Sequence, residues 1–353
     1  EQWYRMNKAT DFSSFYKALK MEALPGYNVV YADKYDSIFY LSNGKIPVRE
    51  KGFNWSSTLP GNTSKTLWTT YYPIEKLPHY LNPPSGYLFN SNHSPFNATA
   101  KTYNLHESDF NPDMGYETHE NNRSMRFMQL LPGDAKIDYS EFKKIKFDRQ
   151  LPQQLAYRTN TDTLFLLNAG DYPELSSVIL TLQNWDKAAS VNSEGATILS
   201  VIFYYVVDKL MKGDAGFKIL TKEKTVEVYR YANDYLLKYF GTTTVPLGDY
   251  QKLVRGNKAI PLSGLPDVIA SMESEPYKNG MVKGRQGESY IELIQFTKQG
   301  PQIESIHSYG SSNKSGSKHY DDQMELFEKQ QLKTMTLDKT AIYKNAERIY
   351  HPQ

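Results

Sequence analysis

The segment from residue 90 to residue 95 carries the side chains whose types and spacing best suit chemistry. It reads Asn-Ser-Asn-His-Ser-Pro and follows a turn at 82–86 and a β-rich run. A neutral Asn amide held where a strand ends is an orientable hydrogen-bond donor, and acyl-transfer reactions use such donors to stabilise an oxyanion. The asparagines of this segment are therefore candidates for such a site. Asn at a strand end is also a common turn residue, so the pattern alone leaves both interpretations open.

Other familiar chemistries find no support in the residue pattern. The chain has no cysteine, which excludes disulfide scaffolds, thiolate metal sites and cysteine nucleophiles. Its seven histidines form no His-Glu-x-x-His spacing, and the sequence contains neither a glycine-rich phosphate loop nor Gly-x-Ser-x-Gly. Asp321 and Asp322 follow His319, but neighbouring side chains on a helix point about 100° apart. We interpret this acidic pair as helix capping rather than as a metal or acid–base site.

Composition and charge indicate a globular protein with a sizeable core. Of the 353 residues, 39% are hydrophobic and 23% are charged, and the net charge is only +2. This nearly neutral charge gives no indication that the protein binds nucleic acid or an anionic membrane. The longest apolar run, at 198–207, is much shorter than the roughly 18 residues of a membrane span. The 28 tyrosines are more simply explained by strand propensity, but they leave open an alternative in which the protein binds glycans without catalysis, because a tyrosine ring combines an apolar face with a polar tip.

Helical and strand patterns occupy different stretches of the chain. Apolar positions at a spacing of three to four predict helices, chiefly at 1–24, 176–182, 194–212 and 225–240. β-rich runs predict five strands that we expect to share one sheet, at 28–33, 38–42, 87–91, 289–296 and 303–308. No linker separates these elements. The sequence thus predicts a single α+β domain over 1–353, with a mostly helical segment at about 120–260.

Taken in order, these segments resemble the penicillin acylase family of N-terminal-nucleophile hydrolases over nearly the whole chain. The strand motifs at 28–33 and 38–49 and the stretch at 73–95, with its Asn-Pro-x-x-Gly turn, carry the similarity. The pair Asn122-Arg123, which opens the next predicted helix, adds to it. Later motifs are more similar to the branch of acyl-homoserine lactone and aculeacin acylases, at 182–186, 248–264, 287–290 and 309–323.

This resemblance implies a fold, an activity and roles for individual residues. The fold would be a partial αββα sandwich with a large helical insertion. The activity would be hydrolysis of the amide bond of an N-acylated small molecule, such as an acyl-homoserine lactone, a lipopeptide or a β-lactam. Asn92 would be the oxyanion-hole side chain and Arg123 would support the active site, with Asn90 and His93 in the wall of the substrate pocket. The protein would be bacterial, periplasmic or secreted, and made as a self-cleaving precursor.

The nucleophile is the point at which this sequence departs from the family's pattern. The resemblance places an N-terminal Ser, which serves as nucleophile and base, much farther upstream of Asn92 than the 91 residues present here. Ser13 and Ser14 match no nucleophile motif. We therefore interpret the chain as the carboxy-terminal part of the large subunit, inactive alone. Its expected partners are the α-chain and the amino-terminal part of the β-chain, which would cover a surface that is exposed here.

Metal binding and activity stay open from the sequence alone. We expect no cofactor. The resemblance allows calcium, but Asp109 and Asp113 match the expected ligands poorly, so no ligand is assigned. A family member that has lost its activity is a further alternative to an active acylase, beside the glycan-binding protein.

Overall fold

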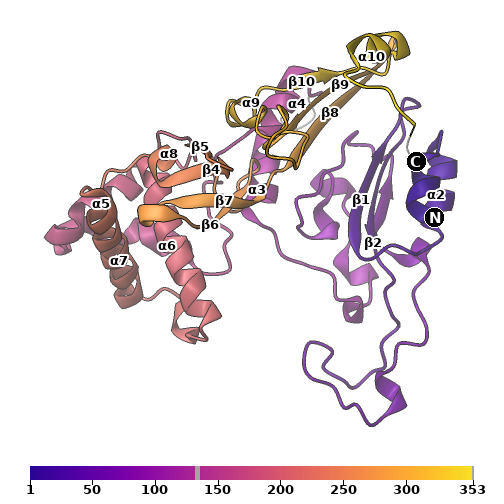
Figure 1. Ribbon diagram of the computed structural model, residues 1–353. Helices are drawn as coiled ribbons and strands as arrows, with labels where there is room; N and C mark the ends of the chain where they lie inside the picture. The colour runs from indigo at the N-terminus through magenta and orange to yellow at the C-terminus, as the bar shows by residue number, and fades with distance from the viewer. Residues whose placement is uncertain (132–135, 352–353) are drawn as a thin grey trace. The chain divides into compact units, whose positions relative to one another are not determined.

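The computed structural model describes residues 1–131 and 136–351, and the chain divides into two compact units, Glu1–Ser124 and Met125–Gln353 (Figure 1). Each unit has its own packed core and is described by itself. Helices and mainly antiparallel sheets occupy different stretches of the chain, so the α+β class predicted from the sequence is confirmed. The single-domain assignment stays a prediction. Among the described residues, no helix is long and apolar enough to cross a membrane.

The first unit begins with two short helices beside a small antiparallel sheet. The helices are α1 (Gln2–Asn7) and α2 (Phe12–Leu19), and the sheet has the order β1 (Tyr27–Ala32), β2 (Ile38–Asn43), β3 (His79–Leu81). The single helix predicted over 1–24 is wrong, because the Asp11 side chain accepts a hydrogen bond from the Ser14 amide and starts a new helix there.

Strand β2 is covered on both faces and anchors this unit. Phe39 and Leu41 pack with Leu19 of α2 on one face, whereas Tyr40 packs with Tyr80 of β3 on the other. All five of these side chains are buried. The remaining chain of the unit forms loops and short 3₁₀ turns, namely η1 (Ser64–Thr66), η2 (Ile74–Lys76), η3 (Pro95–Asn97), η4 (Lys101–Tyr103), η5 (Glu107–Asp109) and η6 (Pro112–Met114).

The strand predicted at 87–91 is wrong, because this segment is irregular in the structure. Its backbone groups are satisfied within the loop rather than by a neighbouring strand. The Phe89 amide donates to the Ala98 carbonyl at 2.9 Å, and the Thr99 hydroxyl donates to the Tyr87 carbonyl at 2.9 Å. The β-rich composition of 87–89 therefore serves loop packing, with Phe89 buried, and not a sheet ladder.

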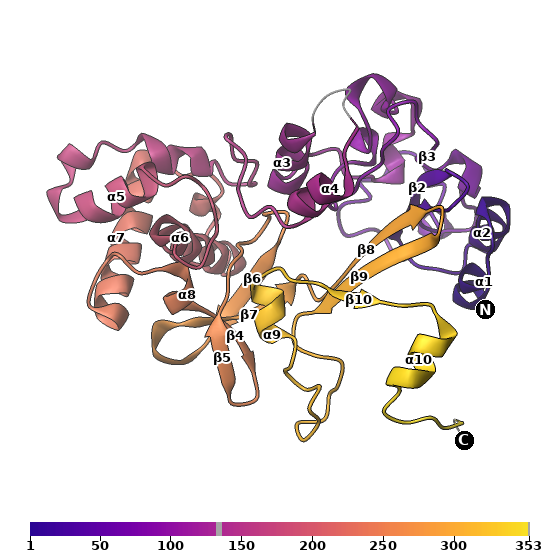
Figure 2. The same ribbon diagram turned by 90° about the horizontal axis from the view of Figure 1, so that it is seen from above.

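The second unit carries most of the helices. They are α4 (Tyr139–Lys146), α5 (Ser176–Gln183), α6 (Glu194–Met211), α7 (Lys222–Phe240) and α8 (Leu247–Tyr250), with 3₁₀ turns η7 (Thr161–Leu166), η8 (Ala169–Asp171), η9 (Pro173–Leu175) and η10 (Ala215–Phe217). Helix α3 (Asn122–Leu130) runs across the sequence boundary between the units. Helices α5, α6 and α7 lie side by side in Figures 1 and 2 and enclose the largest apolar core. The helices predicted at 176–182, 194–212 and 225–240 are confirmed.

Two sheets complete the second unit (Figure 2). One has the order β5-β4-β7-β6, from β4 (Gln251–Arg255), β5 (Lys258–Pro261), β6 (Met272–Pro276) and β7 (Val282–Gly287), with η11 (Lys278–Gly280) between β6 and β7. The other has the order β10-β9-β8, from β8 (Tyr290–Thr297), β9 (Gly300–His307) and β10 (Lys333–Met335). The remaining helices are α9 (Met324–Glu328) and α10 (Lys339–Asn345).

The prediction that the first and last hairpins share one sheet is wrong. β1 and β2 pair with β3, whereas β8 and β9 pair with β10. The capping role proposed for Asp321 and Asp322 is also wrong. Helix α9 starts after Gln323, which makes no side-chain cap, and the Asp322 carboxylate instead accepts a hydrogen bond from His319 at 2.7 Å.

Candidate active site

The loop at 89–94, here called the Asn92 loop, bends sharply at Asn92. The backbone of Asn92 is left-handed, with φ at 60°, a conformation that Asn adopts more readily than most residues. The Asn90 side-chain oxygen accepts a hydrogen bond from the Asn92 amide at 2.9 Å and closes an Asx turn. This turn leaves the Asn92 side chain exposed, whereas Asn90 is half-buried.

Arg123 fixes the orientation of the Asn92 side chain. Its Nη1 donates a hydrogen bond to Asn92 Oδ1 at 3.2 Å. A guanidinium has donors only, so it must face the oxygen end of the amide. The Asn92 Nδ2 group then points away from Arg123 as a donor. The structure therefore brings together the two residues that the sequence singled out for acyl-transfer chemistry.

His93 lies buried inside the Asn92 loop, with 3% of its surface exposed. The Ser91 amide donates to Nδ1 at 3.1 Å, and Nε2 lies 2.7 Å from the Asn97 carbonyl oxygen. Nδ1 must accept, so the ring proton sits on Nε2 and donates to that carbonyl. The ring also stacks on Phe89 at a centroid distance of 4.7 Å. His93 thus holds the loop together from within, and its place in a pocket wall stays a prediction.

Burial determines the protonation state of His93. The pKa of its imidazole lies below the ordinary value of 6.5, chiefly because burial disfavours the charged ring, and Arg123 adds to the effect. The hydrogen bond to Asn97 and the charge of Glu120 act in the opposite direction. A neutral ring agrees with the tautomer that the two hydrogen bonds require.

Asn90 connects the Asn92 loop to strand β2. Its Nδ2 lies 3.4 Å from the hydroxyl of Tyr40, and that hydroxyl donates to Asn28 Oδ1 of β1 at 2.8 Å. Tyr40 is fully buried, and burial raises the pKa of its phenol, so the hydroxyl keeps its proton. The loop is therefore anchored to the sheet by a short chain of neutral hydrogen bonds.

Asn121 is a site residue that the sequence analysis missed. It precedes α3. Its side-chain Oδ1 accepts a hydrogen bond from the Ser124 backbone amide at 2.9 Å, and its backbone amide donates to Ser124 Oγ at 3.1 Å. Its Nδ2 donates to the Ser91 carbonyl at 2.7 Å. The spacing Asn121-x-x-Ser124 before a helix is a capping signal that the sequence offered. The contact with Ser91 had no local signal.

Neither a metal centre nor a nucleophile can be assigned from the side chains of the described residues. No group of three or more His, Cys, Asp or Glu side chains in residues 1–131 and 136–351 could hold a metal ion. Asp113 and Asp109 therefore form no calcium site with such partners, and we derive no step through calcium. Asp11 caps α2, and the amide and hydroxyl of Ser14 both donate to Asp11 Oδ1 at 2.8 Å, so the Ser14 hydroxyl is engaged in the helix cap.

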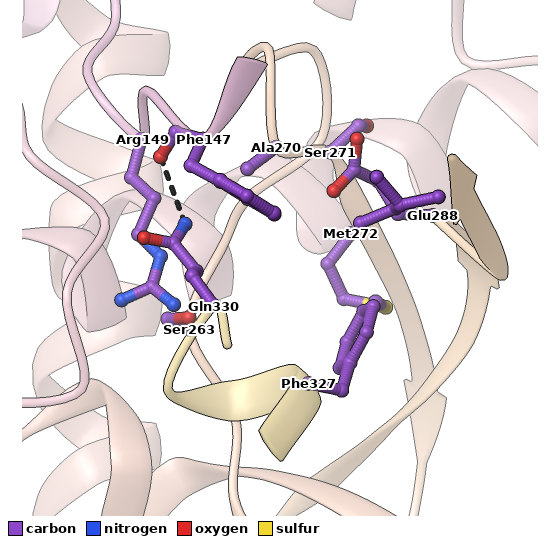
Figure 3. Close-up of a pocket in the computed structure, with 10 residues that line it drawn as sticks. Phe147, Arg149, Ser263, Ala270, Ser271, Met272, Glu288, Phe327 and Gln330 are labelled. Atoms are coloured by element: carbon purple, nitrogen blue, oxygen red, sulfur yellow. Dashed lines mark hydrogen bonds between the residues drawn. The ribbon is translucent and has the colours of Figure 1, made fainter. Parts of the chain in front are cut away.

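A cavity in the second unit is separate from these residues (Figure 3). Its volume is about 290 Å³ including the open mouth, and its walls include Phe147, Arg149, Met272, Glu288 and Phe327. The Gln330 side chain closes one side by donating to the Phe147 carbonyl at 2.8 Å. Small-molecule sites usually measure roughly 300–1,000 Å³. Most of the volume of this cavity is open solvent at its mouth, so its enclosed space is far below that range and we assign no substrate to it.

Comparisons with known proteins match this chain to the family that its motifs resemble. A family model described as penicillin amidase matches residues 1–344. The acyl-homoserine lactone acylase PvdQ of Pseudomonas syringae pv. syringae is 21% identical over 94% of this chain and 47% of its own length. A penicillin acylase 2 proenzyme of a Pseudomonas species is 22% identical over 61% of this chain and 26% of its own length. Penicillin G acylase of Escherichia coli is 34% identical over 26% of this chain and 11% of its own length.

A solved structure shows the same fold. The thermostable penicillin G acylase of Alcaligenes faecalis matches with a TM-score of 0.62 and 16% identity, covering 100% of this chain and 72% of that one. The chain spans about half the length of the curated acyl-homoserine lactone acylase that it matches.

Proposed function

Because the chain belongs to the penicillin amidase family, we propose that it is part of an acylase that hydrolyses the amide bond of an N-acylated small molecule. The hydrogen bond between Arg123 and Asn92 Oδ1 is the observation that carries this proposal. It presents an exposed, neutral amide donor in a fixed orientation, as an oxyanion hole requires. A binding protein without catalysis has no need of that arrangement.

The proposed reaction uses a nucleophile that lies outside this chain. An N-terminal Ser hydroxyl loses its proton to its own α-amine and attacks the substrate carbonyl carbon, whose π electrons move to the oxygen. Asn92 Nδ2 donates to that oxyanion, and Arg123 keeps the amide aligned. The C–N bond then breaks as the leaving amine takes the proton, and water releases the acyl group from the enzyme. Removing one such donor costs about 3 kcal/mol of transition-state stabilisation.

The choice of substrate is supported by the relatives rather than by the site. The acyl-homoserine lactone acylase PvdQ matches 94% of this chain, whereas penicillin acylase 2 matches 61%. We therefore place N-acyl homoserine lactones first among its substrates, ahead of lipopeptides and β-lactams. We propose a periplasmic or secreted bacterial protein, processed from a precursor. Its partners would be the α-chain and the amino-terminal part of the β-chain, and the chain alone would be inactive.

The test is hydrolysis by the complete protein that contains this chain. The complete wild-type protein and its Asn92→Gly variant are incubated with N-acyl homoserine lactones of several chain lengths and with penicillin G, and the free amine is measured. Turnover by the wild type, lost in the variant, supports the proposal. A folded wild-type protein that releases no amine from any of them contradicts the proposal and favours an inactive family member.

A further inference from the structure

The side chain of Asn121 binds two different segments: its oxygen accepts from the first turn of α3, and its nitrogen donates to the Asn92 loop. We propose that Asn121 is a positioning residue for the acylase reaction, which ties the Asn92 loop to the first turn of α3 and thereby sets the direction of the Asn92 amide. This inference rests on the proposed function. It assigns Asn121 no contact with substrate.

The oxygen of the Asn121 side chain caps helix α3. Oδ1 accepts from the Ser124 amide at 2.9 Å, and the Asn121 amide donates to Ser124 Oγ at 3.1 Å, which is the reciprocal pattern of a capping box. A capping residue needs only this oxygen. Ser and Asp cap helices about as well as Asn.

The nitrogen of the same side chain binds the Asn92 loop. Nδ2 donates to the Ser91 carbonyl at 2.7 Å. That carbonyl lies in the same peptide group as the Asn92 amide hydrogen, which donates to Asn90 Oδ1 at 2.9 Å. Both ends of this planar peptide group are thus held by side-chain amides. Its plane, from which the left-handed turn at Asn92 starts, cannot rotate without breaking one of the two bonds.

The same helix start also carries Arg123, the second residue of α3. The bond from Arg123 to Asn92 Oδ1 therefore depends on how far the Asn92 loop lies from the first turn of α3. Asn121 spans that distance through a single side chain. Loss of its nitrogen would let the loop move relative to Arg123, even with the helix cap intact.

The discriminating variant is Asn121→Ser in the complete processed protein, because it keeps a capping oxygen and removes the donor to Ser91. Its matched control is Asn111→Ser in the same unit. Asn111 also accepts from a backbone amide, that of Asp113 at 2.9 Å, and its Nδ2 donates to the Tyr72 hydroxyl at 3.0 Å. Should Asn121→Ser lower the melting temperature by more than a few degrees, Asn121→Asp replaces it.

We expect Asn121→Ser to lower kcat roughly 10- to 100-fold, with KM changed less than about 3-fold, because misplacing a catalytic group by about 1 Å has costs of this size. Asn111→Ser should stay within about 2-fold of wild type. In an Asn92→Gly background the Asn121 substitution should have little further effect, since it acts through Asn92. An unchanged kcat in Asn121→Ser, or an equal loss in both backgrounds, would overturn the proposal.

Hydrogen exchange of the Asn92 backbone amide provides a readout that does not need turnover. Asn121→Ser should reduce its protection in the complete protein, whereas Asn111→Ser should not. If the wild-type protein hydrolyses none of the N-acyl substrates, the proposed function fails and this exchange experiment alone decides the role of Asn121. Equal protection in wild type and Asn121→Ser would overturn that role.

Discussion

Arg123 Nη1 and Asn92 Oδ1 are joined by a hydrogen bond of 3.2 Å between residues 31 positions apart in the sequence. A guanidinium can only donate, so the bond selects one of the two possible orientations of the amide. The donor end of Asn92 is thereby oriented before any substrate arrives. A preorganised donor of this kind stabilises a developing oxyanion without reorganisation during the reaction.

Replacing Arg123 should therefore harm catalysis more than folding. In the complete protein, we expect Arg123→Leu to lower kcat by roughly 10- to 100-fold, because a hydrogen bond to a charged group is worth about 1.5–3 kcal/mol. Arg5→Leu is the matched control, since Arg5 pairs with the exposed Glu1 carboxylate. Steady-state kinetics of both variants decide the matter. Equal kcat values in the two variants would show that Arg123 does not support catalysis.

Asn92 itself should be necessary for turnover and nearly neutral for stability. Asn92→Gly removes the amide and accepts the φ of 60° easily, whereas Asn92→Ala adds left-handed strain of about 1 kcal/mol. We expect both variants to lose about 10²- to 10³-fold in kcat, and only Asn92→Ala to lower the melting temperature measurably. Wild-type kcat in Asn92→Gly would show that the oxyanion role is wrong.

His93 should make the stability of the first unit depend on pH. Burial lowers the pKa of its imidazole below 6.5, so the unfolded chain binds the proton more readily than the folded one. The stability contributed by neutral His93 is present above pH 6.5 and is lost as the pH falls through the lower folded pKa. We expect the difference in melting temperature between wild type and His93→Gln to shrink from pH 7.5 to pH 5.

His319 offers a control of opposite sign for that experiment. Its hydrogen bonds to Asp322 and then to Glu347 raise the pKa of its ring above 6.5. Its contribution is therefore complete below pH 6.5 and is lost as the pH rises through the raised folded pKa. His319→Asn should cost most at low pH. The same pH slope in the His93 and His319 variants would contradict both assignments.

The sequence predicted the long helices and the last hairpin well because their patterns are local. Helix α6 contains the longest apolar run of the chain, α7 has apolar residues at helical spacing, and Ser193 and Thr221 cap their starts. The strand prediction for 87–91 failed because the pairing of this segment is not local. Its β-rich residues are paired with Ala98 and Thr99 in a loop, and no local signal distinguishes that pairing from a sheet.

The four-stranded sheet of the second unit was missed although part of its signal was present. Gly256 and Asn257 separate β4 from β5, and Gly256 is left-handed with φ at 58°, as a tight hairpin requires. At the candidate site, local signals covered only part of the arrangement. Asn92 and Arg123 were both named from the sequence, but the contact from Asn121 to Ser91 depends on tertiary packing.

Gly195 should be irreplaceable despite the poor helix propensity of glycine. A Cβ at this position of α6 would overlap the ring of Trp185, whose Nε1 donates to the Ala188 carbonyl at 3.0 Å. Gly195→Ala should therefore destabilise the chain by about 1–3 kcal/mol through overpacking. Gly316→Ala, at a position with open space around it, should be neutral. Urea denaturation compares the two, and a stabilised Gly195→Ala would contradict this packing.

Strand β8 should make the isolated chain self-associate. It ends the sheet β10-β9-β8, so in the described residues it pairs with β9 alone, and Tyr290, Ile294 and Phe296 on its outer face are 44–45% exposed. An edge strand with an apolar row is a template for pairing with another chain, and a lysine on it blocks that pairing. We expect light scattering to show concentration-dependent oligomers that Ile294→Lys disperses. Ile342→Lys, at a residue of α10 with 49% exposure, should leave them intact. A monomeric wild-type chain, or equal effects of both lysines, would show that β8 is not the surface that self-associates.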